Sequence, residues 1–153
     1  MSHVTDVHLK ITDLEALDEA CVFLGMTLRR GQQSYRWWGR WENDYRGMTA
    51  AVDQGHDPKT FGRCAHAISV SDDPRAYEIG LVPRKDGDGW DLLYDSYDRK
   101  IEPKAGPGLG RLRQEYAVRV TERRVKQTLA RKGFGLTREN LPNGRVRLRL
   151  RRR

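Results

Sequence analysis

Apolar and polar residues alternate along two short stretches in the middle of the chain, joined by a polar turn. In the first stretch, the positions two apart are Cys64, His66, Ile68 and Val70. In the second stretch, the large apolar positions two apart are Tyr77, Ile79 and Leu81. Alternation with a period of two is typical of β-strands that are buried on one face. The pattern therefore predicts two strands within residues 64–84, separated by the polar residues 72–74.

The same kind of pattern predicts the rest of the architecture. Further strands are expected at 7–11 and 90–97, and a hairpin at 134–150 around a two-residue turn, Asn143-Gly144. Residues 26–30 and 33–38 are expected to be extended, with Gly31 as a bend or turn between them. Helical spacing of apolar residues predicts two helices, at 13–24 and 109–132. The expected fold class is α+β, with an antiparallel or mixed sheet of six to seven strands and two helices mainly on one face. The expected order of elements is β-α-β-β-β-β-α-β-β.

The first helix carries signals at both ends. Thr12 and Glu15 fit a capping box, in which the Thr12 hydroxyl accepts a hydrogen bond from a free amide one turn into the helix. Gly25 stands where a left-handed C-terminal cap is expected. Cys21 lies on the apolar stripe between these ends, so we interpret it as a small buried hydrophobic residue.

The second helix and the final strand each have two distinct faces. The helix carries one apolar stripe through Leu112 and Tyr116 and another nearly opposite, through Val125 and Leu129, so it is either covered on two sides or bent. In the final strand, apolar residues alternate with arginines. The outward face is expected to hold Arg145, Arg147, Arg149 and Arg151, followed by Arg152 and Arg153 in the tail.

The length of 153 residues suits one domain, so we expect 1–153 to be a single α+β domain with a long loop at about 43–63 and a basic C-terminal hairpin at 134–153. The net charge of +8 is uneven: residues 105–153 hold fifteen basic and three acidic residues. This asymmetry indicates an acidic partner or neutralisation within the fold. The two cysteines fit no disulfide framework, and the sequence has no apolar signal segment, so a cytoplasmic protein without membrane contact is expected.

One segment combines aromatic and basic residues: Tyr35, Arg36, Trp37, Trp38, Arg40 and Trp41. Tryptophan, tyrosine and arginine are enriched at binding hot spots, and aromatic rings near arginines can stack on single-stranded bases. In a regular strand, Trp37 and Trp38 point to opposite faces, so at most one of them belongs to the core. We expect Trp38, on the face shared with Arg36, to be the more exposed.

Candidate chemistry is sparse. Cys64 and His66 would point the same way on a strand, and His3, His8 or His56 could complete a zinc or iron site, but the spacing is not a metal signature. A buried cysteine and a hydrogen-bonded core histidine are the simpler interpretation, so we expect no metal and no cofactor. The sequence contains no nucleophile elbow and no phosphate-binding loop. We therefore expect the chain not to be an enzyme.

Several motifs follow one another in a fixed order along nearly the whole chain: MSH, DLEAL, YRWWGRW, CAHAISV with AYEIGLV, and QEYAV before the NG hairpin. Together they resemble the domain-of-unknown-function family that includes the chloroplast and cyanobacterial Ycf reading frame thirty-five, in its phage-encoded branch. The resemblance implies a small α+β protein of unassigned activity, without catalytic residues to carry over. Phage-encoded members often stand near an ATPase of the AAA type, so the resemblance also implies such a partner.

Two hypotheses of function follow. The first is a small non-enzymatic interaction module, an adaptor or inhibitor of a host or phage protein. The second is a nucleic-acid-binding protein that uses the arginine-lined strand and nearby aromatic residues. Arginines two apart on a strand are separated by ~6.6–6.8 Å, close to the spacing of successive backbone phosphates. An arginine-rich edge strand also deters aggregation, which would make the row of arginines structural.

Overall fold

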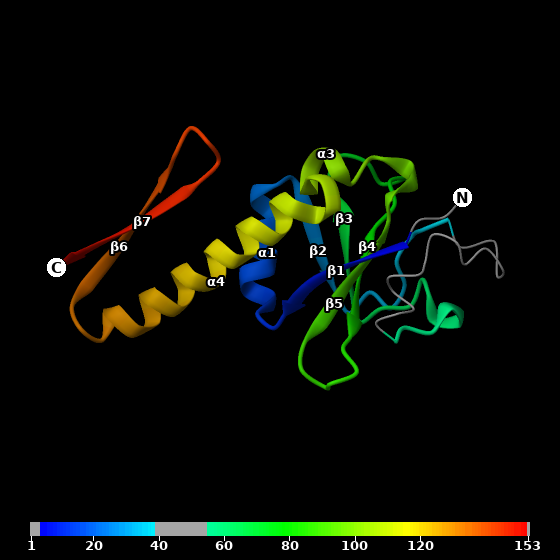
Figure 1. Cartoon of the computed structure of the whole chain (residues 1–153), viewed down its shortest axis with the longest axis horizontal. Helices are drawn as coiled ribbons and strands as arrows, with labels where there is room; N and C mark the ends of the chain where they lie inside the picture. The colour runs from blue at the N-terminus through cyan, green and yellow to red at the C-terminus, as the bar shows by residue number, and fades with distance from the viewer. Residues whose placement is uncertain (1–3, 39–54, 153) are drawn as a thin grey trace.

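The computed structural model describes residues 4–38 and 55–152 (Figure 1). The strands described are β1 (Val4–Ile11), β2 (Met26–Arg30), β3 (His66–Val70), β4 (Ile79–Pro83), β5 (Trp90–Asp95), β6 (Phe134–Asn140) and β7 (Val146–Arg152). The long helices are α1 (Leu14–Phe23) and α4 (Gly110–Ala130), and the short helical segments are η2 (Pro58–Thr60), η3 (Ser96–Asp98), α3 (Glu102–Ala105) and η4 (Pro107–Leu109). The α+β class and the order of strands and long helices are those predicted.

The strands are divided between two sheets. Five strands form an antiparallel sheet in the order β1-β5-β4-β3-β2, and β6 pairs with β7 in a separate hairpin. Figure 1 shows this hairpin beside the far part of α4, away from the sheet. The sequence predicts the strands but not the division. The cause is α4, because a helix of 21 residues is about 30 Å long and carries the chain off the sheet.

One face of the five-stranded sheet is covered by the two long helices, as predicted. Ile68, Leu81 and Leu92 from the central strands pack with Leu17 of α1 and Leu112 of α4, and each is at most 1% exposed. Burial of an aliphatic side chain contributes about 1.5–3 kcal/mol. This apolar layer therefore holds the sheet and both helices together.

The other face of the sheet is covered by an irregular segment. Tyr35 is buried there with Phe61, Ala67 and Leu93 in a second apolar cluster. The Tyr35 ring lies on Gly80 of β4, where a Cβ atom would come within 2.3 Å of Tyr35 Cδ1. Glycine at this position is therefore what allows the Tyr35 ring to lie against the strand.

The segment at 33–38, predicted to be extended, does not form a strand of the sheet. Ser34 makes one isolated antiparallel bridge with Arg63, and the Tyr35 amide donates a hydrogen bond to the Gly62 carbonyl at 2.9 Å. The alternation of side chains in this segment instead reflects contact with the second face of the sheet. That face carries Leu93, whose apolar surface a further edge strand would leave uncovered.

The ends of α1 differ in part from the prediction. The N-terminal cap is Asp13 rather than Thr12: Asp13 Oδ1 accepts a hydrogen bond from the Ala16 amide at 3.0 Å. The Thr12 and Asp13 amides both donate to the hydroxyl of Tyr116 on α4, so a second helix completes the cap. Gly25 has the predicted left-handed conformation, and Cys21 is fully buried, with a pKa that burial and nearby Asp18 raise to about 12.

The helix α4 is covered on two sides, which resolves the two apolar stripes. Leu112 and Tyr116 are buried in the main core, where α4 packs on α1, while Val125 and Leu129 are half-buried in the part of α4 that adjoins the hairpin. The hairpin turn has three residues, 142–144, instead of two, because the Leu141 amide bonds to the Arg145 carbonyl at 2.8 Å. Gly144 takes the left-handed conformation typical of the third position in such a turn.

Among the helices described, none is both long and apolar enough to cross a membrane.

Candidate functional site

Two large aromatic side chains lie exposed next to each other. Trp38 is 38% exposed and Tyr97 is 52% exposed, and their ring centroids are 5.6 Å apart. We call this pair the aromatic surface. Exposed aromatic rings that lie side by side offer a partner one continuous apolar area.

A single buried carboxylate positions both rings. Asp95, at the end of β5, is fully buried; its Oδ2 accepts from the Trp38 amide at 3.2 Å and its Oδ1 from the Tyr97 amide at 3.0 Å. The first bond ties the incoming segment to the sheet, and the second begins the η3 turn. The backbone beneath the aromatic surface is therefore fixed by the sheet.

A polar cavity adjoins this surface. It has a volume of about 570 Å³ and is lined by Ser96, Tyr97, Arg99 and Glu102. Arg99 has a φ of 56°, a left-handed conformation that is uncommon outside glycine and often marks functional segments. The cavity thus presents one cationic and one anionic side chain beside the exposed rings.

The remaining residues of the predicted aromatic segment divide between core and surface. Tyr35 is 3% exposed, so its assignment to a contact surface is wrong, because the ring is used to cover the sheet. Trp37 is half-buried in the same cluster, in edge contact with Phe61, and Trp38 is the more exposed tryptophan, as predicted. Arg36 is exposed, and its guanidinium donates to the Pro74 and Ala76 carbonyls. Arg40 and Trp41 lie outside the described residues.

The second predicted surface lies on the hairpin. Arg147, Arg149 and Arg151 occupy alternate positions of β7, opposite Glu139, Thr137 and Gly135 of β6, and all three arginines are exposed. We call these three residues the arginine face. Glu139 Oε2 is 3.6 Å from Arg147 Nη1 and 3.2 Å from Arg149 Nη2. Arg151 forms no ion pair with a described residue.

The other predicted arginines stand differently. Arg145 precedes β7 at the turn, where its amide donates to Asn143 Oδ1 at 3.1 Å. Arg152 alternates out of the arginine face, because it pairs with Phe134 on the opposite side of the hairpin. Arg153 lies outside the described residues.

The hairpin is attached to the helices by a cluster of charges around two buried carboxylates, Glu115 and Glu122. Arg138 of β6 donates two hydrogen bonds to Glu115 of α4, at 2.8 and 3.0 Å, and Arg119 donates a third to Glu115 at 3.0 Å. Glu122 lies 3.6 Å from Arg138, and the guanidinium groups of Arg138 and Arg119 lie over the Phe23 ring, at 5.4 and 5.5 Å from its centroid. We call these five residues the clamp.

Electrostatics explain why the clamp remains charged. Burial alone would raise the pKa of Glu115, but hydrogen bonds and charge from Arg138 and Arg119 outweigh it and hold that pKa below its ordinary value. Conversely, the bond to Glu115 raises the pKa of Arg138. The cluster therefore pairs buried carboxylates with arginines from two elements, a link that the sequence pattern did not reveal.

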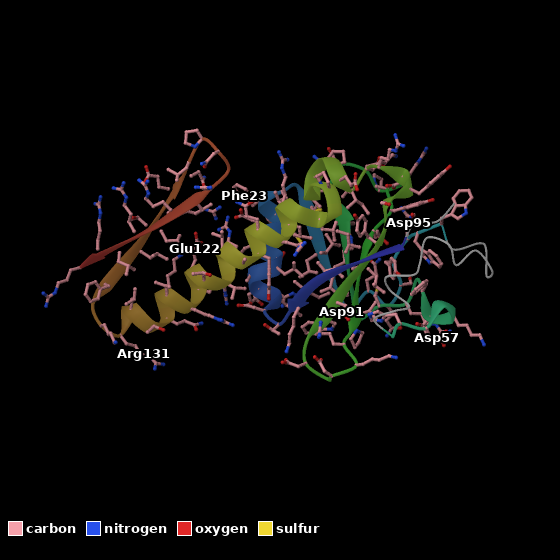
Figure 2. The ribbon with its side chains drawn as sticks, in the orientation of Figure 1. Phe23, Asp57, Asp91, Asp95, Glu122 and Arg131 are labelled. Carbon is pink, nitrogen blue, oxygen red and sulfur yellow. The ribbon has the colours of Figure 1, made fainter. Side chains whose placement is uncertain are left out.

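The aromatic surface and the arginine face lie at opposite ends of the molecule. Figure 2 labels Asp95, under the aromatic surface, at one end, and Arg131, where α4 gives way to the hairpin, at the other. Their separation corrects the expectation of aromatic residues near the arginine-lined strand for the described Tyr35, Trp37 and Trp38, which lie against the five-stranded sheet. The sequence could not show this distance, because α4 sets it.

Cys64 and His66 do not form a shared site. The two side chains lie on opposite faces of the sheet: Cys64 packs on the second cluster, while His66 is in edge contact with Trp90, which packs on the main core. Cys64 Sγ donates to the Gln32 carbonyl at 3.1 Å, and His66 Nδ1 accepts from the Gly31 amide at 2.9 Å. They do not point the same way because Cys64 precedes β3 across a bend.

Metal binding finds no support in the described part of the chain, which contains no group of three metal-ligating side chains. Of the histidines named with this pair, His56 forms a hydrogen bond with Asp91, in which His56 Nε2 and Asp91 Oδ2 are 3.0 Å apart and both residues are 7% exposed. Arg84 completes the group at 2.6 Å from Asp91. Sequence reasoning missed this group, of which His56 and Asp91 are buried, because His56 follows a loop without periodicity. The His3 residue and the His8 side chain lie outside what the structure describes.

Comparison with known proteins gives no relative: no protein-family model, curated protein or solved structure matches this chain.

Proposed function

We propose that the chain is a small non-enzymatic interaction module, an adaptor or inhibitor of a host or phage protein, whose partner contacts the aromatic surface. The observation that supports this proposal is the exposure of Trp38 and Tyr97 together, on a backbone fixed by buried Asp95. Tryptophan and tyrosine are among the residues that contribute most often to binding hot spots.

Preorganisation favours binding at this position. Ordering a flexible side chain in an interface costs about 0.5–1.5 kcal/mol, and rings that already contact each other on a fixed backbone need little further ordering. The neighbouring cavity adds Arg99 and Glu102, whose opposite charges would orient polar groups of the partner. An ATPase of the AAA type is the partner that the family resemblance implies, and the aromatic surface is where we place its contact.

The test compares Trp38→Ala with Val22→Ala. Val22 is 70% exposed and lies on α1, so it provides a surface change of similar kind away from Asp95. Partners recovered from the native host after nuclease treatment are purified, and their affinity for the wild type and both variants is measured by calorimetry. Trp38→Ala should weaken the dissociation constant about 30-fold, corresponding to about 2 kcal/mol, with little dependence on salt. Wild-type affinity in Trp38→Ala would exclude the aromatic surface as the contact.

A second candidate function, nucleic-acid binding, is favoured by a different observation. The arginine face presents three exposed guanidinium groups in a row, and Glu139 is the acidic residue that lies among them. Guanidinium groups pair with phosphate oxygens through two parallel hydrogen bonds. In this candidate, the hairpin alone binds, without the aromatic residues at the other end of the molecule.

A further inference from the structure

We infer that the arginine face binds double-stranded nucleic acid, with the hairpin lying along the phosphate backbone as a basic ribbon. This inference rests on the second candidate function and adds the class of nucleic acid. It depends on which side chains share the outward face of the hairpin and on how the clamp positions that face.

Among the described residues, the outward face of the hairpin has no aromatic side chain. Its described members are Gly135, Thr137 and Glu139 of β6 with the three arginines of β7. Proteins that bind single strands combine positive charge with aromatic rings on which successive bases stack. A duplex has its bases already stacked and presents phosphates outward, so a face with charge and no rings fits a duplex.

The same composition argues against an acidic protein as the ligand. Protein interfaces depend on a few apolar or aromatic residues buried at their centre, and the outward face of the hairpin offers none. Leu148 and Leu150 of β7 alternate onto the opposite face, which adjoins α4. The row of arginines therefore matches a ligand that is recognised through a regular array of anionic oxygens.

The geometry of the hairpin suits a ribbon that contacts a duplex. Neighbouring members of the arginine face are separated by ~6.6–6.8 Å along β7. A two-stranded β-ribbon is also one of the elements that the major groove of DNA can accommodate. The clamp holds the inner face of the hairpin through Arg138, so the outward face keeps a fixed orientation relative to α4.

Glu139 provides an internal competitor. Its carboxylate lies within 3.6 Å of Arg147 and 3.2 Å of Arg149, where it occupies guanidinium donors that would otherwise reach phosphate oxygens. Removing that charge should free both arginines and remove a repulsion against the ligand. A gain of affinity on loss of a single carboxylate is a result that a purely structural row of arginines would not give.

The experiment is a fluorescence-anisotropy titration of the full chain against a labelled DNA duplex, an RNA duplex and the corresponding single strand. With three phosphate contacts, raising salt from about 50 to about 200 mM should weaken duplex binding about 40-fold. Changing Arg147, Arg149 and Arg151 together to Ser should reduce the magnitude of the negative slope of log K against log salt by about 2.7. Glu139→Gln should tighten binding about two- to fivefold, the range of exposed ion pairs.

A matched control has the same change of charge. Arg113, Arg124 and Arg131 are exposed, form no ion pair with a described residue, and by helical spacing lie on the side of α4 opposite Glu115 and the hairpin. Their triple change to Ser should reduce duplex binding far less than the hairpin triple, while circular dichroism confirms that both variants are folded.

Each other outcome overturns the inference in a distinct way. Equal or tighter binding of the single strand would leave the second candidate in place and reject the duplex. Equal losses in both triple variants would reject the arginine face as the site, and efficient competition by polyglutamate would indicate an acidic protein. Absence of binding to every nucleic acid would reject the second candidate as well, without bearing on the aromatic surface.

Discussion

The five-stranded body and the C-terminal hairpin of this protein are held in place by different forces. In the body, side chains such as Leu81 and Leu92 are fully buried between sheet and helices. In the hairpin, no described side chain is fully buried, and the clamp links it to the helices through Arg138 and Glu115. Apolar burial responds little to pH or moderate salt, whereas a charge cluster responds to both.

This difference separates stability from contact chemistry. In the body, both faces of the sheet are covered by apolar packing, and Trp38 and Tyr97 of the aromatic surface are exposed at its end. In the hairpin, the inner face contacts α4 through Arg138 of the clamp, and the arginine face is exposed to solvent. The comparison therefore predicts that changes of equal size have unequal consequences in the two regions.

The largest effect is expected from the loss of a leucine of the body, and a leucine of the hairpin provides the comparison. Leu92→Ala removes a fully buried side chain and should lower the free energy of unfolding by about 3 kcal/mol. Leu150→Ala removes a side chain that is 55% exposed and should change it by less than about 0.5 kcal/mol. Urea denaturation of both variants measures the contrast, and similar losses would show that the hairpin contributes to the same core.

The strands and helices of the body were predicted well because the spacing of their apolar residues is regular. Alternation around Ile68 and Leu81, and helical spacing around Leu17 and Leu112, follow directly from burial on one face. The prediction for 33–38 failed because the same alternation of side chains arises in a strand that pairs within a sheet and in a segment that packs on the face of a sheet.

The candidate surfaces were predictable in composition and not in arrangement. Trp37 and Trp38 were expected to point to opposite faces, so at most one could be buried, and Trp38 shares its face with Arg36. The arginine face was expected because arginines stand at every second position of the final strand. The role of Asp95, the partner ring of Tyr97 and the attachment through Arg138 each depend on contacts between residues far apart in the chain. No local pattern specifies such contacts.

A smaller effect is expected on the second face of the sheet. Gly80→Ala places a Cβ against the Tyr35 ring and should cost about 1–3 kcal/mol, because the buried ring has to shift. Gly110→Ala at the start of α4 meets no atom within 4 Å and should be neutral or slightly stabilising. Thermal unfolding of the pair checks the claim, which a harmless Gly80→Ala would contradict.

The smallest effect is a local loosening of the hairpin in acid. Because the pKa of Glu115 is below its ordinary value of 4.5 in the folded protein, its contribution is complete above that pH and is lost as the pH falls through the folded-state pKa. The protection factors of the β6 amides, which are exchange rates corrected for the intrinsic effect of pH, should therefore fall as the pH drops below 4.5, before the body unfolds. Arg138→Met should show fast exchange already at neutral pH, whereas Arg147→Met, a change of an exposed arginine, should resemble the wild type. Uniform protection of body and hairpin down to the same pH would contradict the comparison.

The most direct test of two separate contact surfaces is a nuclear magnetic resonance titration of the ¹⁵N-labelled protein with a DNA duplex. We expect the amide signals of β7 around Arg147, Arg149 and Arg151 to shift, while the indole signal of Trp38 and the amide of Tyr97 stay in place. Coincident shifts at Trp38 and along β7, saturating at the same duplex concentration, would show that one ligand uses both ends, and would contradict the separation proposed for this molecule.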